Sequence, residues 1–173
     1  MPIQTLEEII QTIKGSKRTL YILCGLPYAG KTYFANTIVK ETSCTFVSID
    51  EIFKGLHYDW DTNKLPDDKG WKEIFDTSYL RSQEALKNDL NVLYDSTNHT
   101  KFSRDALRKI ADEVGAQTKV VYVSISNETL WKRWEENLVK KERSIVDKKL
   151  VQMTIDSFEV PTEDEGILTL QNS

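Results

Sequence analysis

Five short apolar runs recur along the chain, and longer stretches with helical spacing separate them. Each run has the length of a buried strand and is bounded by polar or turn-forming residues. The runs are residues 20–24, 45–49, 92–94, 119–125 and 167–170. Because helical stretches alternate with them, the pattern predicts a parallel five-stranded sheet with helices on both faces, which is a three-layer α/β fold.

Six stretches around these runs carry apolar residues at the spacing of one helix face. Thr5 and Glu8 form a capping-box pair for the first stretch, and Gly15 lies where that helix would end. The six are residues 3–13, 33–41, 71–89, 101–115, a helix capped by Asn127, and residues 146–158, which Pro161 would end. No linker or repeat interrupts the pattern, so we expect one domain over residues 1–173, with residues 1–15 as an N-terminal helix.

The first predicted strand leads directly into the sequence Gly-Leu-Pro-Tyr-Ala-Gly-Lys-Thr at positions 25–32. It matches the P-loop pattern G-x-x-x-x-G-K-T in the strand–loop–helix context that the motif requires. Its glycines let successive backbone N–H groups point at phosphate oxygens, and the following helix adds the positive end of its dipole. Lys31 would reach the β- and γ-phosphates of ATP, and Thr32 would offer its hydroxyl to Mg²⁺. The predicted nucleotide-binding residues are Gly25, Leu26, Pro27, Tyr28, Ala29, Gly30, Lys31, Thr32 and Tyr33.

Two aspartates follow predicted strands. The second strand ends at Asp50, and the third ends at Asp95. Ligands of open α/β sheets bind beyond the carboxyl ends of the strands, so we expect both carboxylates to lie near the P-loop. A carboxylate at Asp95 can hold Mg²⁺ or orient a catalytic group. The alternative for Asp95 is an Asx turn that closes the strand.

Residues 54–70 are aromatic and polar without a clear period, and loops of this length are often functional. They would form either the floor or lid of an acceptor site or a surface loop with one buried tryptophan. His57 is most simply a loop residue. Residues 162–166 form an acidic turn.

A basic cluster follows residue 127 and includes Arg133 and Arg143. It is either a solvated helix face or an arginine-bearing lid over residues 127–147 that folds over the nucleotide. Guanidinium groups can fork onto phosphate or stack on a base, and this makes both arginines candidates for contact with ATP.

Composition narrows the classes of function. The chain has 173 residues and a net charge of −4, which disfavours a protein that holds nucleic acid mainly through phosphates. Its only cysteines, Cys24 and Cys44, adjoin predicted strands and are expected to be buried thiols. The sequence shows no signal peptide and no apolar run near 18 residues, so we expect a soluble cytoplasmic protein without a membrane partner.

Taken together, these motifs resemble the polynucleotide-kinase and zeta-toxin branch of P-loop kinases, which includes many AAA-type predicted kinases. The resemblance rests on the P-loop, the strand ending in Asp50, the D-x-T-N sequence beginning at Asp95, and the basic lid segment. It spans residues 20–170. It implies a nucleoside- or nucleotide-kinase-like P-loop NTPase fold with a helical lid, in a single kinase domain.

The resemblance also implies roles. Asp50 matches the carboxylate that takes the proton from the acceptor hydroxyl, and Asp95 matches the acid that orients lid or metal groups. Lys31 and Thr32 match the residues for phosphate and Mg²⁺. The implied catalytic residues are Lys31, Asp50, Arg133 and Arg143, and the implied metal ligands are Thr32 and Asp95.

The implied activity is transfer of the γ-phosphoryl group of ATP, with Mg²⁺, to a hydroxyl of a small-molecule or nucleotide-type acceptor. Polynucleotide kinases carry a basic residue three positions after the catalytic aspartate, where this chain has Phe53. That departure and the acidic net charge disfavour a nucleic-acid acceptor. Two alternatives stay open: a polynucleotide 5′-hydroxyl kinase, and a non-kinase ATPase or nucleotide-binding switch that acts through an unidentified protein partner.

Overall fold

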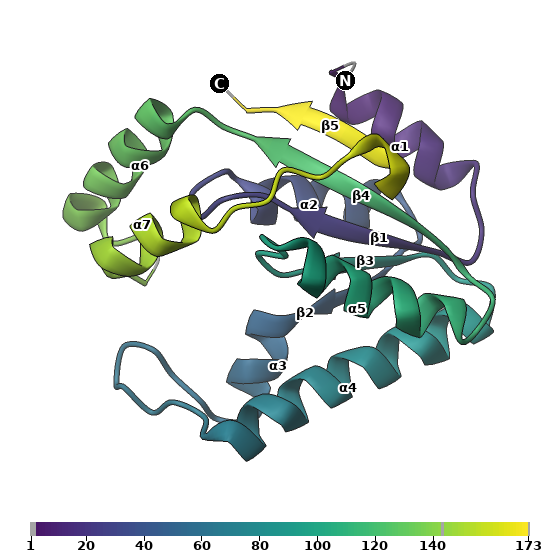
Figure 1. Cartoon of the computed structure of the whole chain (residues 1–173), viewed down its shortest axis with the longest axis horizontal. Coiled ribbons are helices and arrows are strands. Elements are labelled where there is room, and N and C mark those ends of the chain that lie inside the picture. The colour runs from purple at the N-terminus through teal and green to yellow at the C-terminus, as the bar shows by residue number, and fades with distance from the viewer. Residues whose placement is uncertain (1–2, 143, 173) are drawn as a thin grey trace.

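A five-stranded parallel sheet runs through the middle of the molecule, as Figure 1 shows. The computed structural model describes residues 3–142 and 144–172. The strand order is β2-β3-β1-β4-β5, and every residue of the central strand β1 is buried. The strands are β1 (Thr19–Cys24), β2 (Thr45–Ser48), β3 (Val92–Asp95), β4 (Gln117–Ser124) and β5 (Ile167–Gln171). All four pairings are parallel, so the predicted sheet is confirmed.

Helices cover both faces of the sheet because alternate strand residues point to opposite sides. Tyr21 and Leu23 of β1 pack with α1 (Leu6–Lys14) and α2 (Lys31–Glu41). Leu20 and Ile22 share the other core with α3 (Ile49–Gly55), α4 (Asp68–Lys87) and α5 (Lys101–Asp112). The three-layer α/β architecture therefore follows from the alternation within one fully buried strand.

Two further helices, α6 (Asn127–Lys140) and α7 (Lys148–Asp156), lie beyond the carboxyl ends of the strands (Figure 1). They share a small apolar cluster with the P-loop, in which Leu26 and Tyr28 contact Leu130 of α6 and Val151 of α7. A lid segment was expected over residues 127–147, and this packing places its helical part, α6, against the P-loop.

Several predicted helix ends shift by a few residues. The Thr5–Glu8 capping box is confirmed, but Ile3 lies outside α1 and bridges Thr169 of β5. Ser126, not Asn127, caps α6, since its side chain accepts a hydrogen bond of 3.1 Å from the backbone N–H of Thr129.

One helix was not predicted. The second strand was expected to run through residue 49, but β2 ends at Ser48, whose hydroxyl caps α3 by accepting from the N–H of Glu51. Asp50 consequently lies in the first turn of α3 and not at a strand end. Ile49 is buried, and for this reason it resembled one more strand residue.

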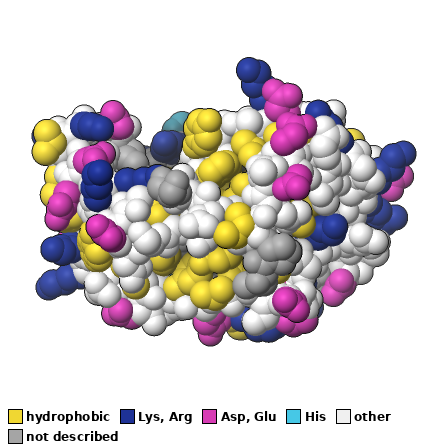
Figure 2. Space-filling model, turned by 90° about the horizontal axis from the view of Figure 1, so that it is seen from above, with side chains coloured by type: hydrophobic (Ala, Val, Ile, Leu, Met, Phe, Trp, Pro, Cys, Tyr) yellow, Lys and Arg dark blue, Asp and Glu magenta, His cyan; other side chains and the backbone are white. Residues whose placement is uncertain are grey.

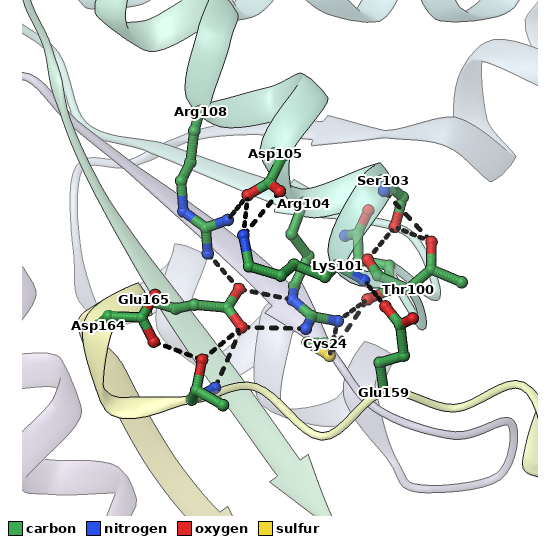
Figure 3. A network of polar contacts seen from close by, with 12 residues as sticks. Cys24, Thr100, Lys101, Ser103, Arg104, Asp105, Arg108, Glu159, Asp164 and Glu165 are labelled. Atoms are coloured by element: carbon green, nitrogen blue, oxygen red, sulfur yellow. Dashed lines mark hydrogen bonds and ion pairs between the residues drawn. The ribbon is translucent and has the colours of Figure 1, made fainter.

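A buried ion pair joins α5 to the turn before β5 (Figure 3). Arg104 Nε and Nη2 donate to the two carboxylate oxygens of Glu165 at 2.8 and 3.0 Å, and both side chains are 1% exposed. Arg108 and the backbone N–H of Thr162 also donate to Glu165. The predicted acidic turn is the 3₁₀ turn η1 (Glu163–Glu165), but its last residue faces inward.

Burial alone would raise the pKa of the Glu165 carboxyl. The hydrogen bonds from Arg104 and Arg108 outweigh that effect and lower the pKa to about 2. Arg104 also holds the loop after β3, because its Nη1 donates to the carbonyl of Asn98 at 3.0 Å. The network therefore ties β5 to the loop that precedes α5.

The two cysteines are buried free thiols, as expected. Among residues 3–142 and 144–172, the structure contains no helix with the length and apolar character needed to cross a membrane.

Replacing Glu165 by Gln should destabilise the protein by about 3–5 kcal/mol at pH 7, because it leaves buried arginine charge without a partner. The folded-state pKa of about 2 lies below the ordinary 4.5, so the carboxylate's stabilisation is complete above pH 4.5 and disappears towards pH 2. The difference in the free energy of urea unfolding between wild type and Glu165→Gln should therefore disappear as the pH falls from 4.5 towards 2. Glu163→Gln, an exposed neighbour, is the matched control, and a gap independent of pH would contradict the assignment.

Candidate active site

The P-loop is a tight turn between β1 and α2 whose two glycines are required by geometry. Gly30 adopts a left-handed conformation, with φ of +88°, and caps α2. A Cβ at Gly25 would lie 2.7 Å from the carbonyl oxygen of Val123, closer than real Cβ atoms come. Glycine offers no side chain to cap α2, and the first turn of that helix holds no acidic residue. The start of α2 is therefore a helix N-terminus of the kind that binds anions, with the positive end of its dipole toward the loop.

Lys31 points back into the curve of this loop. Its Nζ donates to the carbonyl oxygens of Gly25 and Leu26 at 2.8 and 2.9 Å. Thr32, the predicted Mg²⁺ residue, follows it and is exposed on the first turn of α2. The ammonium group thus lies within the loop that the sequence predicts to surround the phosphates.

The loop after β3 is fastened to the start of the P-loop. Asn98 Nδ2 donates to the carbonyl of Leu23 at 2.7 Å, and the N–H of Gly25 donates to the carbonyl of Thr97 at 3.3 Å. Asn98 is 6% exposed and has a φ of +47°. The last two residues of the D-x-T-N sequence therefore connect neighbouring strand ends, three residues or fewer after Asp95.

Asp50 and Asp95 lie at the same edge of the sheet. Asp95 pairs in register with Ser48, two residues before Asp50. Burial raises the pKa of Asp95; Lys31 lowers it, and the negative charges of Asp50 and Glu51 raise it again, to about 6. Because β2, β3 and β1 are neighbouring parallel strands, the structure brings Asp50, Asp95 and Lys31 to one edge of the sheet, where the sequence placed them.

The oxygen donors here fit Mg²⁺ bound together with a nucleotide. Within the described parts of the chain, no group of three or more histidine, cysteine or acidic residues is arranged to hold a metal by itself. Mg²⁺ usually keeps several waters and binds through one or two protein oxygens plus substrate phosphates. The hydroxyl of Thr32 and the carboxylate of Asp95 are oxygen ligands of that kind.

Arg133 reaches the P-loop from α6. Its Nη1 donates to the carbonyl of Tyr28 at 3.2 Å, and its Nη2 donates to Oδ1 of Asn172 at 3.3 Å. Seen from above, a notch containing Lys and Arg side chains separates the α6 side of the molecule, on the left, from the body (Figure 2). Arg143, the other predicted lid arginine, lies outside the described residues.

Asn172 is a site residue that the sequence reasoning missed. It follows β5 and donates from Nδ2 to the carbonyl of Ala29 at 2.7 Å, while its backbone N–H donates to Ser124 at 2.9 Å. A Cβ at Gly30 would lie 2.5 Å from the same Nδ2 atom. Its position one residue beyond the end of the fifth strand, at the edge where ligands bind, was the available signal.

A second hollow begins on α3 at Phe53, three residues after Asp50. Its volume is about 400 Å³, and we call it the aromatic pocket. Its lining residues come from α3, the following loop and the α6–α7 connection: Phe53, Lys54, His57, Tyr58, Asp59, Trp60, Asp61 and Ser144. The first half of the segment 54–70 thus lines a hollow, and its Trp60 is 48% exposed and not buried.

Comparisons with known proteins agree with this geometry. A family model described as an AAA domain matches residues 20–161. No curated protein matches the chain.

Three solved structures share the fold at low identity. A gluconokinase from Sinorhizobium meliloti is 17% identical, with a TM-score of 0.61 over 92% of this chain and 83% of that chain. Kti12 of Chaetomium thermophilum, solved with ADP-AlF3, is 18% identical, with a TM-score of 0.63 over 88% of each chain. A chain of the Pnkp1/Rnl/Hen1 RNA repair complex is 21% identical, with a TM-score of 0.70 over 82% of this chain but 44% of that one.

At these identities the structures support the fold, and the family model covers most of the sequence. The protein therefore belongs to the AAA domain family and has the fold of the P-loop kinases.

Proposed function

We propose that this protein is an ATP-dependent kinase that transfers the γ-phosphoryl group of ATP to a hydroxyl of a small-molecule or nucleotide-type acceptor. The observation that carries the proposal is the placement of Asp50 and Asp95 at the same sheet edge as Lys31. A phosphate site needs the lysine, whereas a nearby carboxylate is needed to receive a proton. One of the similar structures is described as a gluconokinase, which agrees with a hydroxyl acceptor.

The proposed mechanism assigns each residue one task. The N–H groups of the P-loop and α2 hold the phosphates, and Lys31 exchanges its contacts with Gly25 and Leu26 for phosphate oxygens. Thr32 and Asp95 would hold Mg²⁺, which when bound neutralises phosphate charge.

Asp50 accepts the proton of the acceptor hydroxyl as its oxygen attacks the γ-phosphorus, and ADP leaves. Arg133 stands beside the P-loop, where its charge is placed to stabilise negative charge on the phosphates. We propose that residues 127–147 act as the lid of this single domain and exclude water during transfer.

Lys31→Ala and Asp50→Asn should separate binding from transfer. Lys31→Ala should remove most activity, because it deletes the main charge facing the phosphates. Asp50→Asn should leave the nucleotide Kd within about twofold but slow transfer by a factor on the order of 10² or more, the range for a general base. Glu51→Gln, the exposed neighbour on α3, is the control. Normal turnover in Asp50→Asn would remove its assigned role.

Replacing Asp95 by Asn should stabilise the folded protein but reduce its turnover. The folded-state pKa of about 6 lies above the ordinary 3.8, so the wild-type carboxylate lowers stability progressively as pH rises through 4 to 6. Above pH 6 the variant should unfold at a higher urea concentration than wild type. Its free energy of unfolding should be larger by about 1–3 kcal/mol, since a tenfold change in proton affinity corresponds to about 1.4 kcal/mol. An Asx turn alone would tolerate asparagine with unchanged stability and unchanged turnover, and that pair of results would contradict a functional Asp95.

Substitutions of Asn172 test whether its hydrogen bonds hold the P-loop in the conformation that binds nucleotide. Asn172→Ala removes the hydrogen bond to Ala29 and that from Arg133, and should weaken nucleotide binding about 3–10-fold. Asn172→Asp keeps an acceptor for Arg133 but loses the donor and adds a carboxylate beside the phosphate site, so it should bind nucleotide more weakly still. Gln171→Ala, at an exposed neighbour, is the control. An unchanged Kd in Asn172→Asp would show that the contact is incidental.

A further inference from the structure

The aromatic pocket begins one helical turn beyond Asp50. Phe53 and Lys54 follow Asp50 by three and four residues on α3, the spacing that puts side chains on the same helix face. A molecule in this pocket can therefore extend along that face and present a hydroxyl to the Asp50 carboxylate. The volume of about 400 Å³ is within the range of small-molecule sites.

One wall of the pocket is a stacked pair of rings. Phe53 and Trp60 have ring centroids 5.1 Å apart and planes within 11° of parallel. Phe53 is 2% exposed, whereas Trp60 is 48% exposed. Phenylalanine thus supports the indole from behind, and the indole offers a flat apolar face to a ligand ring.

The electrostatics of the pocket are unfavourable to phosphate. Among the described residues, its lining contains one lysine and two aspartates, and Asp50 and Glu51 lie earlier on the same helix, α3. The pKa of Asp59 is lowered by the N–H of Asp61, by the hydroxyl of Thr62 and, more weakly, by Lys54, so the lysine charge already faces a carboxylate. A phosphate carried by the acceptor would meet a net negative charge from the described residues of this lining.

Polar groups complete the pocket from the opposite side. Ser144, in the α6–α7 connection, donates from Oγ to Oδ2 of Asp61 at 3.3 Å. This contact spans from the proposed lid to the loop after α3. Carboxylate, hydroxyl and imidazole groups around one aromatic face match a ligand that has several hydroxyls on a ring.

We propose that the aromatic pocket holds the acceptor and selects a polyhydroxylated ring of the carbohydrate class that carries no phosphate. This inference rests on the proposed kinase function. In the reaction, a hydroxyl oxygen of the sugar forms a bond to the γ-phosphorus, the bond between that phosphorus and the β–γ bridging oxygen breaks, ADP departs, and the hydroxyl proton moves to Asp50. Trp60 stacks on the ring, and the buried Phe53 supports the indole.

The test compares matched acceptors that differ in phosphate. One pair is glucose and glucose 6-phosphate, and the other is N-acetylglucosamine and its uridine diphosphate derivative. Kanamycin is added as a cationic acceptor and a 5′-hydroxyl oligonucleotide as a polyanionic one. Products are identified by mass and rates by ADP release. A phosphate-free sugar or kanamycin should be phosphorylated with kcat/KM at least tenfold above any phosphate-bearing acceptor. Preference for the phosphate-bearing members, or for the oligonucleotide, overturns the inference.

Variants of Trp60 test the pocket itself. Trp60→Ala should raise the KM of the preferred acceptor tenfold or more and leave the KM of ATP within twofold, whereas Trp60→Phe should restore most of the loss. Phe102→Ala, at a residue 85% exposed on α5, is the control. An unchanged acceptor KM in Trp60→Ala overturns the inference.

The two proposals fail differently. A phosphorylated oligonucleotide or sugar phosphate would leave the kinase standing and remove only the carbohydrate pocket. ATP hydrolysis with no phosphorylated product from any acceptor would remove both.

Discussion

The fixed backbone of the P-loop is the constraint on which the rest of the site depends. The loop is held from one side by the β3 loop, through Asn98 and Thr97, and from the other by Asn172 after β5. The segments that follow β3 and β5 therefore fix the positions of the P-loop N–H groups that would face phosphate. Such preorganised donors need no rearrangement when charge develops, which is how an enzyme gains most from electrostatic stabilisation.

Placing carboxylates beside a phosphate site has a cost in stability. The raised pKa of Asp95 reflects that cost, because burial and the charges of Asp50 and Glu51 oppose its ionisation more strongly than Lys31 favours it. Elsewhere the fold contains a buried charge pair that is fully matched, Arg104 with Glu165. The contrast between a matched pair in the scaffold and an unmatched carboxylate at the sheet edge is typical of a functional site.

The sequence allowed prediction of what depends on local pattern. Strand and helix order, the P-loop and the clustering of Asp50 with Asp95 all follow from periodicity and from the rule that strand ends share one edge. It could not reveal α3, because Ile49 continues an apolar run. Nor could it pair Arg104 with Glu165, 61 residues apart, or Asn172 with Ala29, 143 residues apart, since such contacts exist only after folding. The roles of the site residues stay predictions.

Following the γ-phosphorus of ATP by ³¹P NMR is the most direct test of the central claim. The protein would be incubated with Mg²⁺, ATP and the acceptor panel, and the spectrum would distinguish a phosphate ester from inorganic phosphate. A kinase predicts that a new ester resonance grows as the γ resonance declines, and that Asp50→Asn nearly abolishes it. Growth of inorganic phosphate alone, at a rate indifferent to every acceptor, would contradict the account.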